Sequence, residues 1–85
     1  MTVWVRVMLK EGVLDPQGKA IADALRRLGT TSVGDVRAGK IFRIDVATAD
    51  AAAAVAAARK MAETLLANPV IEDFVVEPAS AESAP

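Results

Sequence analysis

The chain contains no cysteine and no histidine among its 85 residues. Without cysteine it can form neither a disulfide nor a thiolate nucleophile. Without histidine it lacks the commonest general base and the commonest metal ligand. No pair of carboxylates is spaced for acid–base work, so we expect no catalytic, cofactor-binding or metal-binding residue on this chain.

Aromatic residues and excess charge are also scarce. The chain has one tryptophan and two phenylalanines, and 10 basic against 11 acidic residues give a formal net charge of −1. A nucleic-acid surface needs a basic patch and stacking aromatics, so we expect no nucleic-acid partner. No charge-free apolar run approaches the 18 residues of a membrane span, and the first residues alternate like a strand rather than a secretory signal. We therefore expect a cytoplasmic protein without a membrane partner.

Residues 10–18 form the most informative local stretch, because they join an apolar strand to an amphipathic helix. Gly12 stands where the strand must stop and turn. Asp15 is placed to cap the helix N-terminus, and Pro16 falls at the first helical position, where its missing N–H removes no bond. Gly18 lowers helix propensity in the first turn, which predicts a close approach by another backbone segment.

The apolar pattern predicts six elements in the order strand, helix, strand, strand, helix, strand. They cover residues 2–9, 16–28, 31–37, 40–46, 48–67 and 70–77, with a tight turn at residues 38–39. Right-handed crossovers then favour an α+β, ferredoxin-like β-α-β-β-α-β plait. Its sheet would have four antiparallel strands, with both helices on one face. We expect a single domain over residues 1–77 and a disordered tail over residues 78–85.

Each predicted helix has a distinct apolar surface. In the first, Ile21, Ala24, Leu25 and Leu28 form one stripe, and Gly29 is placed to end the helix. The second begins with seven alanines and one valine in residues 51–58. We interpret this alanine run mainly as compositional bias, although such a helix can also lie close to a sheet.

The predicted sheet leaves one face without helices. Alternation places Ile41, Arg43 and Asp45 on the same side as alternate residues of the first strand. A chain this short is expected to gain stability by association through such a face. The candidate self-association residues are Trp4, Arg6, Met8 and Arg43.

One segment matches part of a phosphate-binding loop. Residues 34–40 fit G-x-x-x-x-G-K, but Ile41 stands where serine or threonine would hold magnesium. A strand pattern follows the segment, whereas a phosphate loop must lead into a helix. We interpret Gly39 and Lys40 as part of a turn.

Several short segments, taken together and in order, resemble the PurS family, the small subunit of bacterial phosphoribosylformylglycinamidine synthase. The resemblance extends from about Val3 to Glu77. It rests on Gly12-Val13-Leu14-Asp15-Pro16-Gln17-Gly18, Ala24-Leu25, Leu28-Gly29, Val36-Arg37, Gly39-Lys40 and Leu65-Leu66-Ala67-Asn68-Pro69-Val70-Ile71-Glu72.

The resemblance implies a role in a complex rather than chemistry on this chain. In the family's complex, a glutaminase subunit releases ammonia and a synthetase subunit uses ATP and magnesium to convert FGAR to FGAM. The small subunit bridges them and assists ammonia transfer. The resemblance also implies a dimer, or a tetramer. As a hypothesis, the partner contacts lie in loops and turns, at Gly12, Asp15, Pro16, Gln17, Arg37, Lys40, Asn68 and Pro69.

A second function remains open at this point. The regulatory ACT module shares the plait order and binds an amino acid at a dimer interface through a glycine-containing first loop. Gly12 could serve there. A thermal-shift screen with free amino acids would separate this ligand-binding alternative from a bridging subunit.

Overall fold

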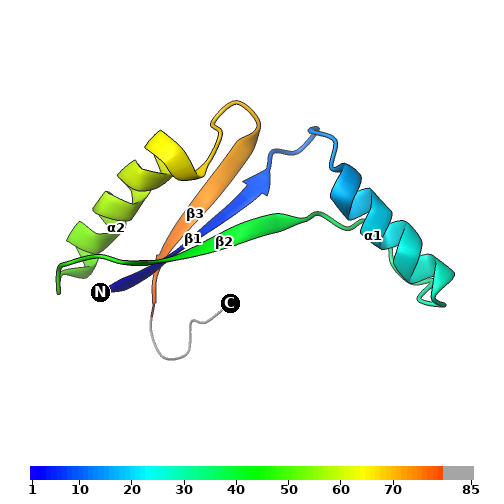
Figure 1. Cartoon of the computed structure of the whole chain (residues 1–85), viewed down its shortest axis with the longest axis horizontal. Coiled ribbons are helices and arrows are strands. Elements are labelled where there is room, and N and C mark those ends of the chain that lie inside the picture. The colour runs from blue at the N-terminus through cyan, green and yellow to red at the C-terminus, as the bar shows by residue number, and fades with distance from the viewer. Residues whose placement is uncertain (80–85) are drawn as a thin grey trace.

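The computed structural model of the chain describes residues 1–79. It is an α+β fold whose 3-stranded antiparallel sheet has the order β2-β1-β3 (Figure 1). The elements are β1 (Thr2–Leu9), α1 (Pro16–Arg27), β2 (Gly39–Asp45), α2 (Ala51–Met61), the π-helical turn η1 (Ala62–Leu66) and β3 (Glu72–Pro78). The predicted residues 80–85 of the tail lie outside the described part of the chain.

The central strand β1 sorts its side chains onto two different faces. Val3, Val5 and Val7 are almost fully buried, and they are the largest fully buried side chains of the described fold. On the same face, Phe42, Ile44 and Val46 pack against this cluster, as the alternation of the sequence predicts. The core is therefore small and lies between the sheet and α2.

Helix α2 lies close to the sheet because its inner side chains are small. Asp50 caps the helix by accepting a bond from the Ala52 amide, 3.2 Å away. Ala54, Ala58 and Ala62 are fully buried against the sheet. The alanine run thus has a packing role that composition alone does not explain. The second helix also ends differently from the prediction, since its last turn is the π-helical η1.

The predicted strand at residues 31–37 does not form, so the sheet lacks the fourth strand that the sequence predicts. In the described part of the chain the sheet has the order β2-β1-β3, and residues 31–37 pair with none of its strands. The polar groups of this segment bond to side chains instead. The Arg26 guanidinium donates to the carbonyls of Val33 and Gly34, and the Ala38 amide donates to Asp15. These bonds take up two carbonyls of the segment and the amide that follows it, and β2 begins at Gly39, within the predicted turn.

The predicted plait places both helices on one face of the sheet, but α1 does not lie on the face that α2 covers. It projects beyond the end of the sheet, and the two helices lie on opposite sides of the strands (Figure 1). Residues 10–38, which include α1 and its two connections, are called the arm below. The radius of gyration is 15.8 Å, whereas a compact chain of this length has about 12 Å. The projecting arm accounts for this elongated shape.

Glycine ends α1 in the manner that the sequence predicts. Gly29 has a φ of +102°, which favours glycine. The Thr30 amide donates to the Leu25 carbonyl and the Gly29 amide to the Arg26 carbonyl, at 3.0 and 3.1 Å. This pair of bonds is a Schellman cap, in which Leu28 is the C-cap residue that follows Arg27.

Candidate functional site

Asp15 joins the two connections of the arm at a single carboxylate. Its side chain is only 5% exposed. One oxygen accepts the Gly18 amide at 2.9 Å, which is the predicted helix cap, and the other accepts the Ala38 amide at 2.7 Å. Beside it, the Arg37 guanidinium donates to the Lys10 carbonyl at 3.1 Å. The chain entering α1 and the chain leaving the arm are therefore held together at its base.

The surroundings of Asp15 favour its ionised form. Hydrogen bonds from the Gly18 and Ala38 amides, helped by the charge of Arg37, lower the pKa of the carboxyl below its ordinary value of 3.8. Burial acts in the opposite direction but is the weaker influence. The arm thus depends on a charged residue that acid can neutralise.

We expect Asp15→Asn to show this dependence in a pH series. Because the folded-state pKa is the lower one, the unfolded chain binds the proton more readily, and the stabilisation by Asp15 is present above about pH 4. It is lost as the pH falls through the folded-state pKa. The variant should therefore be less stable than the wild type at pH 7, with the difference shrinking below about pH 4. Urea unfolding at several pH values measures this, and a pH-independent difference would contradict it.

Gly18 explains how closely the arm is packed. A Cβ placed on this residue would lie 2.0 Å from the Val36 carbonyl oxygen. The predicted backbone approach at Gly18 is thus confirmed, and the approaching segment belongs to residues 33–38. Ala22, one turn later, is also buried. Helix α1 therefore packs on its own returning chain with its smallest side chains.

A second surface is the sheet face that carries neither helix, called the open sheet face below. The strand register confirms that Ile41 and Arg43 lie beside Arg6 and Trp4. The other strand adds Val75 and Glu77, opposite the same two β1 residues. The face consists of Thr2, Trp4, Arg6 and Met8 of β1, Ile41, Arg43 and Asp45 of β2, and Asp73, Val75 and Glu77 of β3. All four predicted self-association residues thus share one surface.

The open sheet face combines exposed apolar side chains with paired charges. Met8 and Ile41 are each 40% exposed and Val75 is 54% exposed. The Arg6 guanidinium donates to both carboxylate oxygens of Glu77 at 2.8 Å. Within residues 1–79, the buried indole nitrogen of Trp4 has no hydrogen-bond acceptor. Exposed apolar side chains beside a paired Arg6 and Glu77 suit burial in an interface better than exposure to water.

The predicted partner-contact residues gather at one end of the sheet. Gly12 and the helix start follow β1, Arg37 precedes β2, and Asn68 and Pro69 precede β3. Antiparallel pairing brings these connections together. A hollow of about 280 Å³ borders Asp15, Gln17 and Lys40, together with Glu72. This set of connections is called the loop cluster below.

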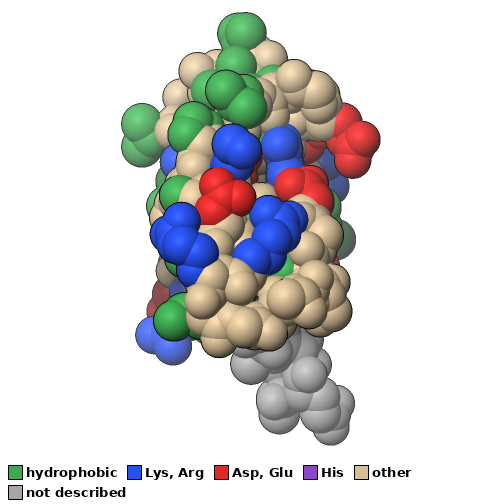
Figure 2. All heavy atoms as spheres, turned by 90° about the vertical axis from the view of Figure 1, so that its right-hand side faces the viewer, with side chains coloured by type: hydrophobic (Ala, Val, Ile, Leu, Met, Phe, Trp, Pro, Cys, Tyr) green, Lys and Arg blue, Asp and Glu red, His purple; other side chains and the backbone are tan. Residues whose placement is uncertain are grey.

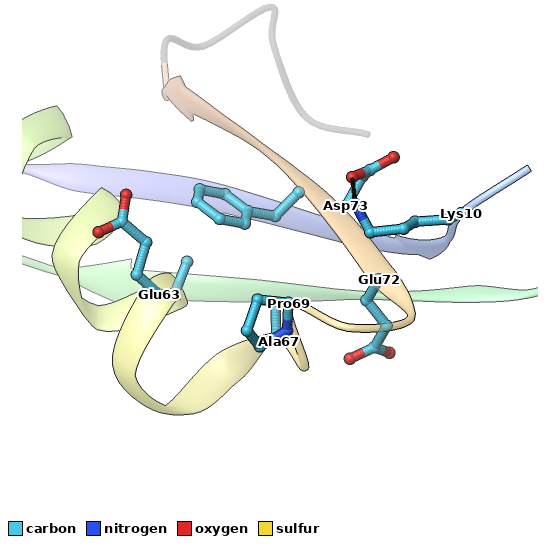
Figure 3. A pocket seen from close by; sticks show the side chains of 8 residues that line it. Lys10, Glu63, Ala67, Pro69, Glu72 and Asp73 are labelled. Carbon is cyan, nitrogen blue, oxygen red and sulfur yellow. Dashed lines mark hydrogen bonds and ion pairs between the residues drawn. The ribbon is translucent and has the colours of Figure 1, made fainter.

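Ion pairs and hydrogen bonds brace the loop cluster. Lys10 contacts Asp73 at 2.9 Å, and Lys40 lies 3.8 Å from Glu72. The Asn68 amide donates to the Glu72 carboxylate at 2.7 Å. Lys10, Glu72 and Asp73 line a hollow of about 320 Å³. Figure 3 shows Lys10 and Asp73 joined, Pro69 next to Ala67, and Glu72 pointing away from the Lys10–Asp73 pair.

The bracing residues Lys10, Glu72, Asp73 and Glu77 were not among the predicted site residues. Lys10 and Asp73 are 63 positions apart and Arg6 and Glu77 are 71 positions apart, because strands are paired across large sequence separations. Opposite charges on two strands were visible in the sequence, but the register that matches them was not.

The described residues contain neither a metal-ligand cluster nor a phosphate loop. In residues 1–79, no three metal-ligating side chains come together. No helix in that part of the chain is both long and apolar enough to cross a bilayer. The G-x-x-x-x-G-K segment leads into β2, as predicted, and not into a helix.

Comparison with known proteins agrees with this geometry. The family model PurS, described as phosphoribosylformylglycinamidine (FGAM) synthase, matches residues 2–80. The PurS subunit of the same synthase from Mycobacterium leprae is 57% identical over 42 residues, 49% of this chain and 53% of that protein. The match thus spans about half the length of that curated relative.

Solved structures resemble nearly the whole fold. Crystalline PurS from Methanocaldococcus jannaschii is 34% identical, with a TM-score of 0.82, over 89% of this chain and 92% of the other. A chain in the structure of PurLQS from Thermotoga maritima is 30% identical, also with a TM-score of 0.82, over 89% and 93%. The family match, the shared fold and the ordered segments around Asp15 lead to one conclusion: this chain belongs to the PurS family.

Proposed function

We propose that the chain is a non-catalytic small subunit of phosphoribosylformylglycinamidine synthase, which makes FGAM from FGAR in purine biosynthesis. The observation that carries this proposal is the membership of the PurS family. The small core supports it, because three valines are the largest fully buried side chains while many larger apolar residues stay exposed. Such a chain is expected to function in an assembly.

In the proposed assembly, the open sheet face and the loop cluster contact different partners. The open sheet face, with Trp4, Arg6, Met8 and Arg43, binds a second copy. The loop cluster binds the glutaminase and synthetase subunits and keeps ammonia from escaping to water as it passes between them. In this proposal ATP and magnesium act on the synthetase subunit, and the chain works in the cytoplasm.

Activity with two nitrogen sources tests the bridging role. We expect glutamine-dependent FGAM formation by the glutaminase and synthetase subunits to fall to background when this chain is omitted. Turnover with free ammonia should continue, because the synthetase chemistry does not need the bridge. If both activities are unchanged without the chain, the proposed function is wrong.

A charge-reversal pair locates the partner contact. Arg37→Glu with Lys40→Glu should weaken co-purification with the two larger subunits, since both residues lie in the loop cluster. Arg59→Glu with Lys60→Glu makes the same change of charge at two exposed residues of α2 and should leave assembly unchanged. Equal behaviour of the two double variants would exclude the loop cluster as the contact.

The ligand-binding alternative is not supported by the comparisons, whose family and structural matches name PurS. Gly12 is exposed, with a φ of +85°, which a turn alone explains.

A further inference from the structure

The hollow of about 320 Å³ in Figure 3, called the η1 hollow below, lies between η1 and the start of β3. The Ala67 amide donates to the Ala62 carbonyl at 3.0 Å, and this bond over five residues makes the turn wider than an α-helical one. Both alanines are buried and line the hollow, where their small side chains leave space. Isolated π-helical turns are frequent at functional sites, which makes the η1 hollow a candidate binding site.

The surroundings of the η1 hollow are largely apolar. Pro69 and Phe74 line it, and Phe74 also packs against the core. In the same stretch of the chain, four large apolar side chains are between 39% and 84% exposed, namely Met61, Leu65, Val70 and Ile71. Exposed apolar side chains beside a hollow are typical of a surface that another protein covers.

The carboxylates at the η1 hollow differ in whether they have a partner. Asp73 contacts Lys10 at 2.9 Å. Glu72 lies 3.8 Å from Lys40. Glu63 is exposed, and within residues 1–79 it forms no ion pair. Figure 3 shows Glu63 across from the Lys10–Asp73 pair, so it leaves a negative charge that a basic partner would neutralise.

A hollow of about 280 Å³ on the arm serves as a comparison. Its lining holds three acidic and three basic side chains, and Asp23 lies 3.9 Å from Lys19 and 3.1 Å from Arg26. Figure 2, which faces the α1 end of the molecule, shows charged side chains of both signs across the middle of this end. The η1 hollow, in contrast, is lined by three acidic side chains and one basic side chain. Its charge is therefore not balanced by its own lining.

We propose that the η1 hollow binds an arginine side chain from an apolar segment of one of the two larger subunits. The guanidinium pairs with the Glu63 carboxylate, because its planar fork matches a carboxylate. The aliphatic stem of the arginine lies along Pro69 and Phe74, and the apolar neighbours of the arginine cover Leu65 and Val70. The proposal rests on the proposed bridging role and adds the chemistry by which a partner recognises this end of the sheet.

Cross-linking from the edge of the η1 hollow identifies what covers it. Because the chain has no cysteine, Leu65→Cys can be labelled with a benzophenone maleimide before the chain is mixed with the two larger subunits. We expect light to link this position to a segment of a larger subunit that contains an arginine. Ala52→Cys, at the exposed start of α2, is the control and should not link to that segment. A link to a second copy alone, or to a segment without a basic residue, would overturn the proposal.

A charge exchange tests the ion pair itself. Glu63→Arg should raise the dissociation constant of the chain from the larger subunits about tenfold or more, because repulsion between like charges replaces a charge-assisted hydrogen bond. Ala52→Arg adds the same side chain to the exposed surface of α2 and should leave this constant unchanged. Replacing the cross-linked arginine of the partner by glutamate should restore the affinity of Glu63→Arg. No recovery, or a lysine at the linked position, would contradict the choice of arginine.

A small probe separates a failure of this contact from a failure of the proposed function. We expect N-acetylarginine amide to cause saturable shifts in the amide NMR signals of residues 62–67. The uncharged N-acetylcitrulline amide, which has nearly the same shape, should not, and Glu63→Gln should remove the response to the arginine compound. If these shifts appear but glutamine-dependent turnover does not need the chain, the bridging role is wrong and the basic-residue site stands. If turnover needs the chain but Glu63→Arg assembles like Ala52→Arg, the η1 hollow is not the contact and the bridging role stands.

Discussion

Gly18→Ala is expected to lower the midpoint of thermal unfolding by about 10 °C. The added methyl carbon would lie 2.0 Å from the Val36 carbonyl oxygen and 2.9 Å from its carbon. The obstacle is backbone, which cannot rotate away like the end of a flexible side chain. Overpacking of this kind costs about 3 kcal/mol, and the helix propensity gained offsets about 1 kcal/mol of it. In a domain of this size each kcal/mol of the remaining loss shifts the midpoint by roughly 4–8 °C.

The sign of this change separates packing from helix propensity. Alanine is favoured over glycine inside a helix by roughly 1 kcal/mol, so without the contact to Val36 the same variant would be more stable. Gly34→Ala is the matched control, because nothing lies within 4 Å of its added carbon. We expect the control to unfold at or slightly above the wild-type temperature. A Gly18→Ala variant as stable as this control would show that the arm does not pack as described.

The second large effect is expected from Ala58→Leu. Ala58 is fully buried where α2 meets the valines of β1. A leucine there must separate the helix from the sheet or distort both. We expect a loss of about 3 kcal/mol in the free energy of unfolding, measured by urea titration.

Ala56→Leu is the corresponding control, because Ala56 lies on the exposed side of the same helix. Its effect should stay within about 0.5 kcal/mol. Equal losses in the two variants would mean that α2 has no preferred face toward the sheet. A large loss at residue 58 alone would establish that the alanine run sets the distance between the two layers.

The two surfaces of the site differ in how far they could be predicted. The open sheet face followed from the alternation in residues 2–9 and 40–46, which is a property of each strand alone. The contribution of β3 to this face, and the two hydrogen bonds from Arg6 to the Glu77 carboxylate, could not be predicted without the pairing register of the strands. For the loop cluster, the sequence indicated the turn and cap residues, but it could not show that connections from three strands meet at one end.

The largest error of prediction concerned residues 31–37, and competing backbone partners explain it. The alternation of this segment resembles a strand, yet a strand exists only where a neighbouring strand accepts its hydrogen bonds. Here the Arg26 guanidinium bonds to the Val33 and Gly34 carbonyls, and the Asp15 carboxylate accepts the Ala38 amide just after the segment. The same bonds join this segment to α1 and to its N-terminal cap, so the absence of the strand and the position of α1 are linked.

The sequence by itself determined the features that depend on neighbouring residues. These include the Asp15 cap, the first helical proline, the end of α1 at Gly29 and the two faces of β1, because capping, turn geometry and strand alternation act over a few residues. Only the tertiary structure decided which segment approaches Gly18, how many strands the sheet has and where α1 lies. Those outcomes depend on which distant groups meet, and in a chain with so small a core they leave large apolar side chains exposed on the sheet and on α1.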